Sequence, residues 1–382
     1  MEKEIINHEV QKYINANLTT DLHSLLLKKS PFPEVSMQEI VQQIKGKQVA
    51  KKKFPFLLKE GIIFPPQLSL EQSSSEKTAV YKSEILKGKK FIDLTSGFGI
   101  DAYYLSQNFE EITLIEQNAE LLEIVEHNWK ILDKKARFIN QKLEDFLTEN
   151  KEIFDVIYLD PARRDNNKNK VFLLEDLSPN IIEIQEKLLS ISNEVVIKLS
   201  PLIDLKYLIS ILKGVSRIEI IAIKNDVKEV VVFLSNQISD KIICNCINLE
   251  SDESNFTFTL EEEENAHAEY AEPEKFIYIP NNSMLKAGVF NLISEKFQLK
   301  KLHPNSHFYT SNEKKSHFPG RVFEMEIIDA KEIKKKSQFN IISKNYPLKP
   351  EEIKKKYGLK DGGENYLIFT QSKKGKIILK SV

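Results

Sequence analysis

Short apolar runs alternate with amphipathic segments between residues 89 and 233. The segments between the runs, such as NAELLEIVEHNWKIL and NIIEIQEKLL, repeat their apolar residues at helical spacing. Strands that alternate with helices form parallel sheets covered by helices on both faces. The pattern therefore predicts an α/β fold with a Rossmann-like, doubly wound sheet, whose strands are KKFIDL, EITLIE, ARFIN, DVIYLD and EVVIKLS.

Two further runs, SRIEIIAIKND and KEVVVFL, follow each other almost directly. A parallel crossover needs about a dozen residues or more, so these runs should form a hairpin. We expect the sheet to end with one antiparallel strand. Extra strands, KIICNCINL and NFTFTL, and a solvated acidic linker should follow.

The two ends of the chain have different patterns. Helical spacing at the N-terminus predicts a helical region with Ser36 as a cap, and another helix should start near Ser73, which has capping-box spacing to Glu76. The C-terminal part predicts a small α+β module with a helix from Met284 to Phe297 and another from Pro350. The expected domains are residues 1–72, 73–270, 271–318 and 319–382.

The first predicted strand leads through FIDLTSGFGIDAYYL directly into a helix. Glycines at such a turn, here Gly97 and Gly99, let the backbone approach a ligand at the helix N-terminus. The third glycine of the dinucleotide fingerprint is missing, which weakens an interpretation as an NAD site. Asp93, Thr95 and Asp101 belong to the same segment and are candidate cofactor-binding residues.

Each of the next three predicted strands is followed by a carboxylate. Glu116 ends the second strand, where an acidic side chain can accept hydrogen bonds from both ribose hydroxyls. Asp145 follows the third strand, in a position to accept a hydrogen bond from an adenine amine. Asp160 and Pro161 end the fourth strand at the switch point where doubly wound sheets hold ligands. Each element alone has a structural explanation, but their succession predicts one ligand site.

Several segments resemble known families. DLTSGFGIDA, Glu116, Asp145 and LDPAR resemble motifs of class I S-adenosylmethionine-dependent methyltransferases over about residues 75 to 235, and the glycine loop is similar to that of bacterial enzymes methylating guanine N2 in small-subunit ribosomal RNA. YIPNNSMLKAGVFNLISEKFQLKKLHPNSHFYTS and FPGRVFEMEI resemble bacterial methyltransferases with a ferredoxin-like segment and a THUMP-like C-terminal domain. The resemblance implies an S-adenosylmethionine-dependent enzyme acting on an exocyclic amine of a base in structured RNA, either rRNA or tRNA.

The resemblance also assigns roles by position. Enzymes that methylate amines have a polar residue followed by Pro-Pro-aromatic where this chain has Asp160, Pro161 and then Ala162. Asp160 and Pro161 are the implied catalytic residues, since the carboxylate and a nearby carbonyl would align the amine with the methyl group. Thr78, Tyr81 and Lys82 are expected to close over the methionine end. The implied cofactor-binding residues are Asp93, Thr95, Gly97, Gly99, Asp101, Glu116 for the ribose and Asp145 for the adenine.

Arg163 and Arg164 are two of only five arginines in a chain that otherwise uses lysine for positive charge. A planar guanidinium can stack on a base or bind a phosphate through two hydrogen bonds, which makes both residues candidates for substrate binding. The alternative is that one of them pairs with Asp165 or Glu175 and only fixes the loop.

Composition limits the remaining possibilities. The net charge is −1, but Ser283 to Val382 carries twenty lysines and Arg321 against ten acidic residues, which suits a polyanion or a solvated face. No apolar run approaches the ~20 residues that span a bilayer, and no signal peptide is evident, so we expect a soluble cytoplasmic protein. The oligomeric state is not predicted.

Other kinds of chemistry have little support. Cys244 and Cys246 lie outside the methyltransferase-like region, which argues against covalent methylation of pyrimidine C5. His303, His307 and His317 lack a matching pattern of ligands, so no metal is expected. Two alternatives stay open: a protein or small-molecule methyltransferase, and a non-catalytic RNA-binding or assembly factor that retains a cofactor pocket.

Overall fold

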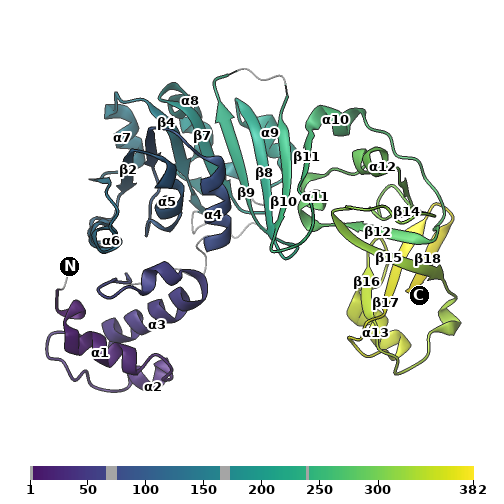
Figure 1. The fold of residues 1–382 in the computed structure, drawn as a ribbon, viewed down its shortest axis with the longest axis horizontal. Coiled ribbons are helices and arrows are strands. Elements are labelled where there is room, and N and C mark those ends of the chain that lie inside the picture. The colour runs from purple at the N-terminus through teal and green to yellow at the C-terminus, as the bar shows by residue number, and fades with distance from the viewer. Residues whose placement is uncertain (1–2, 66–74, 164–172, 238–240) are drawn as a thin grey trace. The chain divides into compact units, whose positions relative to one another are not determined.

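The structure, a computed structural model, describes residues 3–65, 75–163, 173–237 and 241–382 (Figure 1). The chain divides into two compact units. The first contains Met1–Val215 and Val232–Ile238, and the second contains Ser216–Val231 and Ser239–Val382. In the described ranges, no helix has both the length and the apolar character needed to cross a bilayer.

The first unit begins with a small helical region. The helices α1 (His8–Ala16), α2 (Leu22–Leu26) and α3 (Met37–Lys53) share a core in which Ile14, Leu25 and Ile40 are fully buried. Ser36 caps α3 in a capping box with Glu39, as the sequence predicts. The expected N-terminal helical region is confirmed. The 3-10 helix η1 (Lys3–Ile6) precedes α1, and the 3-10 helix η2 (Pro55–Leu58) follows α3.

Five parallel strands form the central sheet of the first unit, in the order β7-β4-β1-β2-β3. Their middle residues, including Ile92, Ile157 and Val196, are completely buried. The chain order reverses between β1 and β4, and this places the switch point at their carboxyl ends. The predicted doubly wound sheet is confirmed. Its strands are β1 (Lys90–Asp93), β2 (Glu111–Glu116), β3 (Arg137–Asn140), β4 (Phe154–Leu159) and β7 (Ser192–Leu199).

Helices connect these strands. Helix α4 precedes β1 and packs on α5, and α6 packs on β2 and β3. The cap of α4 is Ser75, whose side chain accepts a hydrogen bond from the N–H of Thr78, and Ser73 lies outside the described residues. The bounds are α4 (Glu76–Ile85), α5 (Ile100–Leu105), η3 (Ser106–Asn108), α6 (Ala119–Ile131), α7 (Leu143–Glu149), η4 (Leu174–Asp176), α8 (Ile181–Ser190) and α9 (Leu205–Ile211).

The predicted hairpin forms, and the sheet continues beyond it. Lys224 and Asn225 connect β8 (Val215–Ile223) to β9 (Asp226–Ser235), and both have the positive φ of a tight hairpin turn. In the second unit, β10 (Ile243–Leu249) pairs in parallel with β8, and β11 (Phe256–Thr259) pairs antiparallel with β10. The predicted extra strands are present, but the hairpin is not the end of the sheet, because the backbone of β10 pairs with β8.

The acidic segment after β11 is not the solvated linker that the sequence suggests. It includes α10 (Leu260–Asn265), which starts with a capping box between Thr259 and Glu262. The carboxylate of Glu263 accepts hydrogen bonds from the N–H groups of Phe290 and Leu292, each at 2.9 Å. N–H groups at the start of a helix have no acceptor within the helix, so they attract a carboxylate. The acidic segment therefore has a structural role.

A second sheet, with the order β13-β14-β12-β15-β18-β17-β16, completes the second unit. The helix expected over Met284 to Phe297 is two helices, because Gly288 at φ 75° ends the first of them. The helices are α11 (Asn282–Ala287), α12 (Leu292–Phe297) and α13 (Pro350–Tyr357), with the 3-10 helix η5 (Ala330–Glu332). The strands are β12 (Phe276–Pro280), β13 (Lys300–Lys301), β14 (Tyr309–Ser311), β15 (Gly320–Ile327), β16 (Asn340–Ser343), β17 (Tyr366–Ser372) and β18 (Gly375–Ser381).

Candidate active site

The loop between β1 and α5 is fixed to its neighbours by hydrogen bonds. Asp93 Oδ1 accepts the N–H of Thr95 at 2.9 Å, and Thr95 Oγ1 accepts the N–H of Asp160 at 2.7 Å. Ser96 donates both its N–H and its hydroxyl to the carbonyl of Ile115, each at 3.0 Å. The ends of β1, β2 and β4 are therefore held together at the carboxyl edge of the sheet.

The two glycines of this loop have different tasks. Gly97 has φ 50°, and a Cβ there would meet only the Thr95 carbonyl, at 3.9 Å. Gly99 has φ 75°, and its Cβ would lie 3.0 Å from Trp129 Nε1 and 3.1 Å from Val125. Gly97 therefore leaves open space over the loop, whereas Gly99 allows α5 to pack closely against α6.

A cavity of about 350 Å³ lies at this edge of the sheet. Asp93 and Gly97 line it from the β1 loop, Glu116 from the end of β2 and Lys198 from the end of β7. Ser178, in the short strand β6 (Leu177–Ser178), lines it as well. Of the residues predicted from the sequence, the structure brings six together in the wall: Asp93, Thr95, Gly97, Asp101, Glu116 and Asp160.

The carboxylate of Glu116 is held against the glycine loop. One oxygen accepts the N–H of Gly97 at 3.1 Å, and the other accepts the N–H of Asn118 at 2.8 Å. These bonds fix the position of the carboxylate while it lines the cavity. Each carboxylate oxygen can accept more than one hydrogen bond, so Glu116 can still receive hydroxyl donors.

Five predicted site residues do not line the cavity or lie outside the described residues. Asp145 is exposed in the first turn of α7, and Gln141 and Glu144 line the cavity there instead. Pro161 is buried directly behind Asp160, and Arg163 is exposed in the short strand β5 (Ala162–Arg163). Gly99 contributes to packing, as described above. Arg164 lies outside the described residues.

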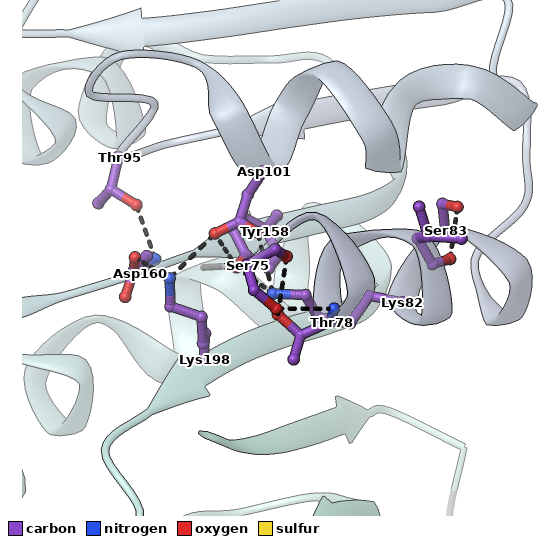
Figure 2. Close-up of polar contacts among 10 residues, drawn as sticks. Ser75, Thr78, Lys82, Ser83, Thr95, Asp101, Tyr158, Asp160 and Lys198 are labelled. Atoms are coloured by element: carbon purple, nitrogen blue, oxygen red, sulfur yellow. Dashed lines mark hydrogen bonds and ion pairs between the residues drawn. The ribbon is translucent and has the colours of Figure 1, made fainter. Parts of the chain in front are cut away.

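Figure 2 shows a charged network, and its residues Asp101, Asp160 and Lys198 line the cavity. Lys198 Nζ lies 2.9 Å from Asp101 Oδ2 and also contacts the carboxylate of Asp160. Lys82 Nζ lies 3.0 Å from Asp101 Oδ1, and the hydroxyl of Tyr158 donates to Asp101 Oδ2 at 3.0 Å. Side chains from α4, α5, β4 and β7 therefore meet in one network.

The surroundings change the acidity of these carboxyl groups. Burial raises the pKa of Asp93 to about 8, and the nearby Asp101 and Asp160 act in the same direction. Burial also acts to raise the pKa of Asp101, but Lys198 and Lys82 outweigh it and hold that pKa well below its usual range. Burial raises the pKa of Asp160, against the opposing effect of Lys198. Asp101 is therefore held in its ionised form, whereas the ionisation of Asp93 and Asp160 depends on the charges next to them.

The sequence reasoning missed Lys198 and Tyr158, and it placed Lys82 wrongly. Lys82 is fully buried behind Asp101 and does not line the cavity, although it was expected to close over it. A signal for Lys198 existed, because a charged residue in the apolar run EVVIKLS needs a buried partner. In the described ranges, no group of three or more His, Cys, Asp or Glu side chains is placed to hold a metal ion.

Comparisons with known families cover most of the chain. Residues 77–198 match the family described as conserved hypothetical protein 95. Residues 276–319 match a ferredoxin-like domain, and residues 320–380 match a family described as THUMP domain-like. The first match contains the cavity, and the other two lie in the second unit.

Two relatives extend this result. An uncharacterized RNA methyltransferase of Mycoplasma mobile is 26% identical over 182 residues, which cover 46% of this chain and 49% of the relative, so the chain spans about half the length of that curated protein. The crystal structure of a candidate methyltransferase from Porphyromonas gingivalis W83 is 30% identical, with a TM-score of 0.87 over 100% of this chain and 98% of that chain. The chain therefore belongs to the family of the Porphyromonas gingivalis protein, with ferredoxin-like and THUMP-like parts.

Proposed function

We propose that this protein is an S-adenosylmethionine-dependent methyltransferase that acts on an exocyclic amine of a base in structured RNA. The cavity at the carboxyl ends of β1, β2 and β4 carries this proposal. It has a fixed carboxylate, Glu116, against the glycine loop and a second carboxylate, Asp160, that directly follows β4 and lines the cavity. A fixed carboxylate such as Glu116 can bind the ribose of a nucleoside, and Asp160 can bind the group that accepts the methyl.

The residues present fit the cofactor. Glu116 would hold the ribose hydroxyls, and Gly97 leaves space beside it. The wall includes the carboxyl groups of Asp93, Asp101 and Asp160 with Lys198, and a cation bound beside them would favour the ionised form of Asp93. Bound here, S-adenosylmethionine supplies an electrophilic methyl group on a positively charged sulfur. The adenine contact predicted for Asp145 stays a prediction, because Gln141 and Glu144 line that part of the cavity.

Asp160 is the proposed catalytic residue. Its carboxylate would accept a hydrogen bond from the N–H of the target amine, which leaves the lone pair on nitrogen directed toward the methyl donor. When nitrogen gains a methyl group it must lose a proton, and a carboxylate at this point can accept it. Pro161, with its fixed φ and no N–H, would hold the backbone in place next to Asp160.

Arg163 is the proposed contact to the substrate on the outer side of β5. Its side chain is exposed, and its guanidinium could stack on a base where related enzymes have an aromatic residue. The same role for Arg164 stays a prediction. Asp160 acts on the amine, whereas Arg163 would bind the surrounding nucleotide.

Two observations support RNA as the substrate. Residues 320–380 match a THUMP domain-like family, and the Mycoplasma mobile relative is described as an RNA methyltransferase. The lysine excess from Ser283 to Val382 agrees with binding to a polyanion. Binding through lysines should weaken steeply as salt rises, which distinguishes RNA from a neutral small molecule.

The test is methyl transfer from labelled S-adenosylmethionine into total RNA from a strain that lacks this protein. We expect wild-type protein to label RNA and Asp160→Ala to label none. Wild-type protein that binds the cofactor but leaves RNA unlabelled would contradict the proposed substrate, and label in protein would identify the alternative. Protein that binds no cofactor would contradict the proposed activity itself.

A further inference from the structure

Lys198 is unusually buried for a lysine and bridges two carboxylates. Its side chain is 11% exposed, whereas that of Lys213, in a surface ion pair of the same unit, is 66% exposed. Lys198 Nζ lies 2.9 Å from Asp101 and contacts Asp160 (Figure 2). Taking an ammonium out of water is costly, so its position needs compensation from both partners.

Asp101 anchors this ammonium. Its side chain is 11% exposed, and it receives Lys82 Nζ at 3.0 Å, Lys198 Nζ at 2.9 Å and the hydroxyl of Tyr158 at 3.0 Å. Lys82 is itself completely buried. Three donors on one carboxylate fix its orientation, so Asp101 holds Lys198 in place and is poorly suited to react.

Asp160 is the more accessible carboxylate of the network. Its side chain is 40% exposed and lines the cavity, compared with 11% for Asp101. Its neighbours include two other acidic groups, Asp93 and Asp101. Like charges at close range favour protonation of one member, and a protonated Asp160 would donate a hydrogen bond where an amine requires an acceptor.

We propose that Lys198 is a positioning residue for methyl transfer: its ammonium, anchored by Asp101, keeps Asp160 ionised and oriented toward the cavity. This inference rests on the proposed function. Lys198 acts through Asp160 and not on the acceptor. Loss of Lys198 should therefore impair the reaction far more than it impairs cofactor binding.

The test compares Lys198→Met and Lys198→Arg with wild-type protein and with the surface control Lys213→Met. Cofactor affinity is measured by calorimetry, and the initial rate is measured with labelled S-adenosylmethionine and total RNA at saturating cofactor. We expect Lys198→Met to lower the rate about 100-fold at neutral pH, with a cofactor Kd within about threefold of wild type. Lys198→Arg should recover a large part of the rate, and Lys213→Met should change neither quantity.

The pH profile separates positioning from a merely structural role. The groups around Asp160 are Asp93 from the β1 loop, Asp101 from α5, and Lys198 and Lys82 from β7 and α4. Lys198→Met removes one of these charged groups and leaves Asp93, Asp101 and Lys82 in place. Without the ammonium, Asp160 should take up its proton at higher pH, so the rising limb of the rate profile should move upward by about one pH unit. Lys198→Arg should keep the limb close to its wild-type position.

Each result decides between explanations. Wild-type protein that does not label RNA would refute the proposed function. Active wild-type protein would refute the inference if Lys198→Met kept full rate, lost rate without a shifted limb, or lost cofactor binding. If Lys198→Met fails to fold, Lys198→Gln replaces it in the same assays of rate, pH profile and cofactor binding. Full rate, or a loss of rate without a shifted limb, would then overturn the inference.

Discussion

The two sides of the cavity are held by different kinds of interaction. On the glycine-loop side, backbone N–H groups fix the carboxylates of Asp93 and Glu116. On the side of Asp160, long side chains from separate elements hold each other through charge, and one such pair, Lys198 and Asp101, is 97 positions apart. The first side depends on a local turn, whereas the second exists only once the sheet has assembled.

This difference predicts which substitutions should disrupt each side most. A backbone-held loop depends on which residues can adopt its φ values, so glycine substitutions should damage it most. A charged network depends on the presence of every partner, since removing one leaves another charge buried and unpaired. The following changes test this contrast, from the largest expected effect to the smallest.

Lys82→Met removes the deepest partner of the charged network. Lys82 is completely buried and Asp101 is 11% exposed, so the lost ion pair should lower the free energy of unfolding by about 3 kcal/mol. Urea unfolding measures this effect. Lys213→Met, which breaks an exposed pair, should cost less than about 1 kcal/mol. Equal costs for the two variants would show that burial does not set the strength of the network.

Glu116→Ala removes the carboxylate proposed to bind the ribose. Hydrogen bonds to a charged group contribute about 2 kcal/mol, so the cofactor Kd should rise roughly 30-fold. Calorimetric titration with S-adenosylmethionine measures the change. Glu120→Ala, an exposed residue in the first turn of α6, serves as the control. An unchanged Kd in Glu116→Ala would remove this residue from the site.

Gly99→Ala should cost more stability than Gly97→Ala, because only the alanine at 99 would crowd neighbouring side chains. An alanine at 99 combines a positive φ with contacts of 3.0 and 3.1 Å to Trp129 and Val125, so it should cost about 2 kcal/mol of stability. An alanine at 97 meets only the strain of its φ, which should cost about 1 kcal/mol. Thermal or urea unfolding decides the order. The opposite order would contradict the geometry of the loop.

Asp93 should make cofactor binding depend on pH. Its pKa is about 8 in the folded protein, against 3.8 ordinarily, so its contribution to stability falls as pH rises between these values. A cationic ligand favours the carboxylate form and should release a proton on binding. Affinity for S-adenosylmethionine should therefore rise about tenfold between pH 7 and pH 9, and Asp93→Asn should abolish this rise. A wild-type affinity independent of pH would show that Asp93 is not coupled to the ligand.

The same contrast explains how much the sequence could predict. Asp93, Gly97 and Glu116 lie at or next to strand ends, which the sequence shows through the spacing of apolar residues and through turn-forming residues. All three line the cavity. Lys198 lies in the apolar run EVVIKLS, but nothing local in the sequence pairs it with Asp101. Which side of a helical turn faces the cavity also depends on packing, so Glu144 lines it and the predicted Asp145 does not.

The same reason applies to the fold. The five parallel strands follow from alternation in the sequence, whereas continuation of the sheet through β10 depends on pairing with β8, a long-range partner. The role of Glu263 as a cap for the start of α12 likewise joins segments 27 to 29 positions apart. Local periodicity predicts elements, but it does not identify partners that meet only in the folded chain.

The most direct measurement of the central claim is calorimetric titration of Asp160→Asn with S-adenosylmethionine, beside an assay of methyl transfer to total RNA by the same protein. The account predicts a cofactor Kd within about threefold of wild type, together with loss of methyl transfer. This result would show that Asp160 serves the acceptor and not the cofactor. Loss of cofactor binding in Asp160→Asn, or transfer at the wild-type rate, would contradict the separation of the two sides.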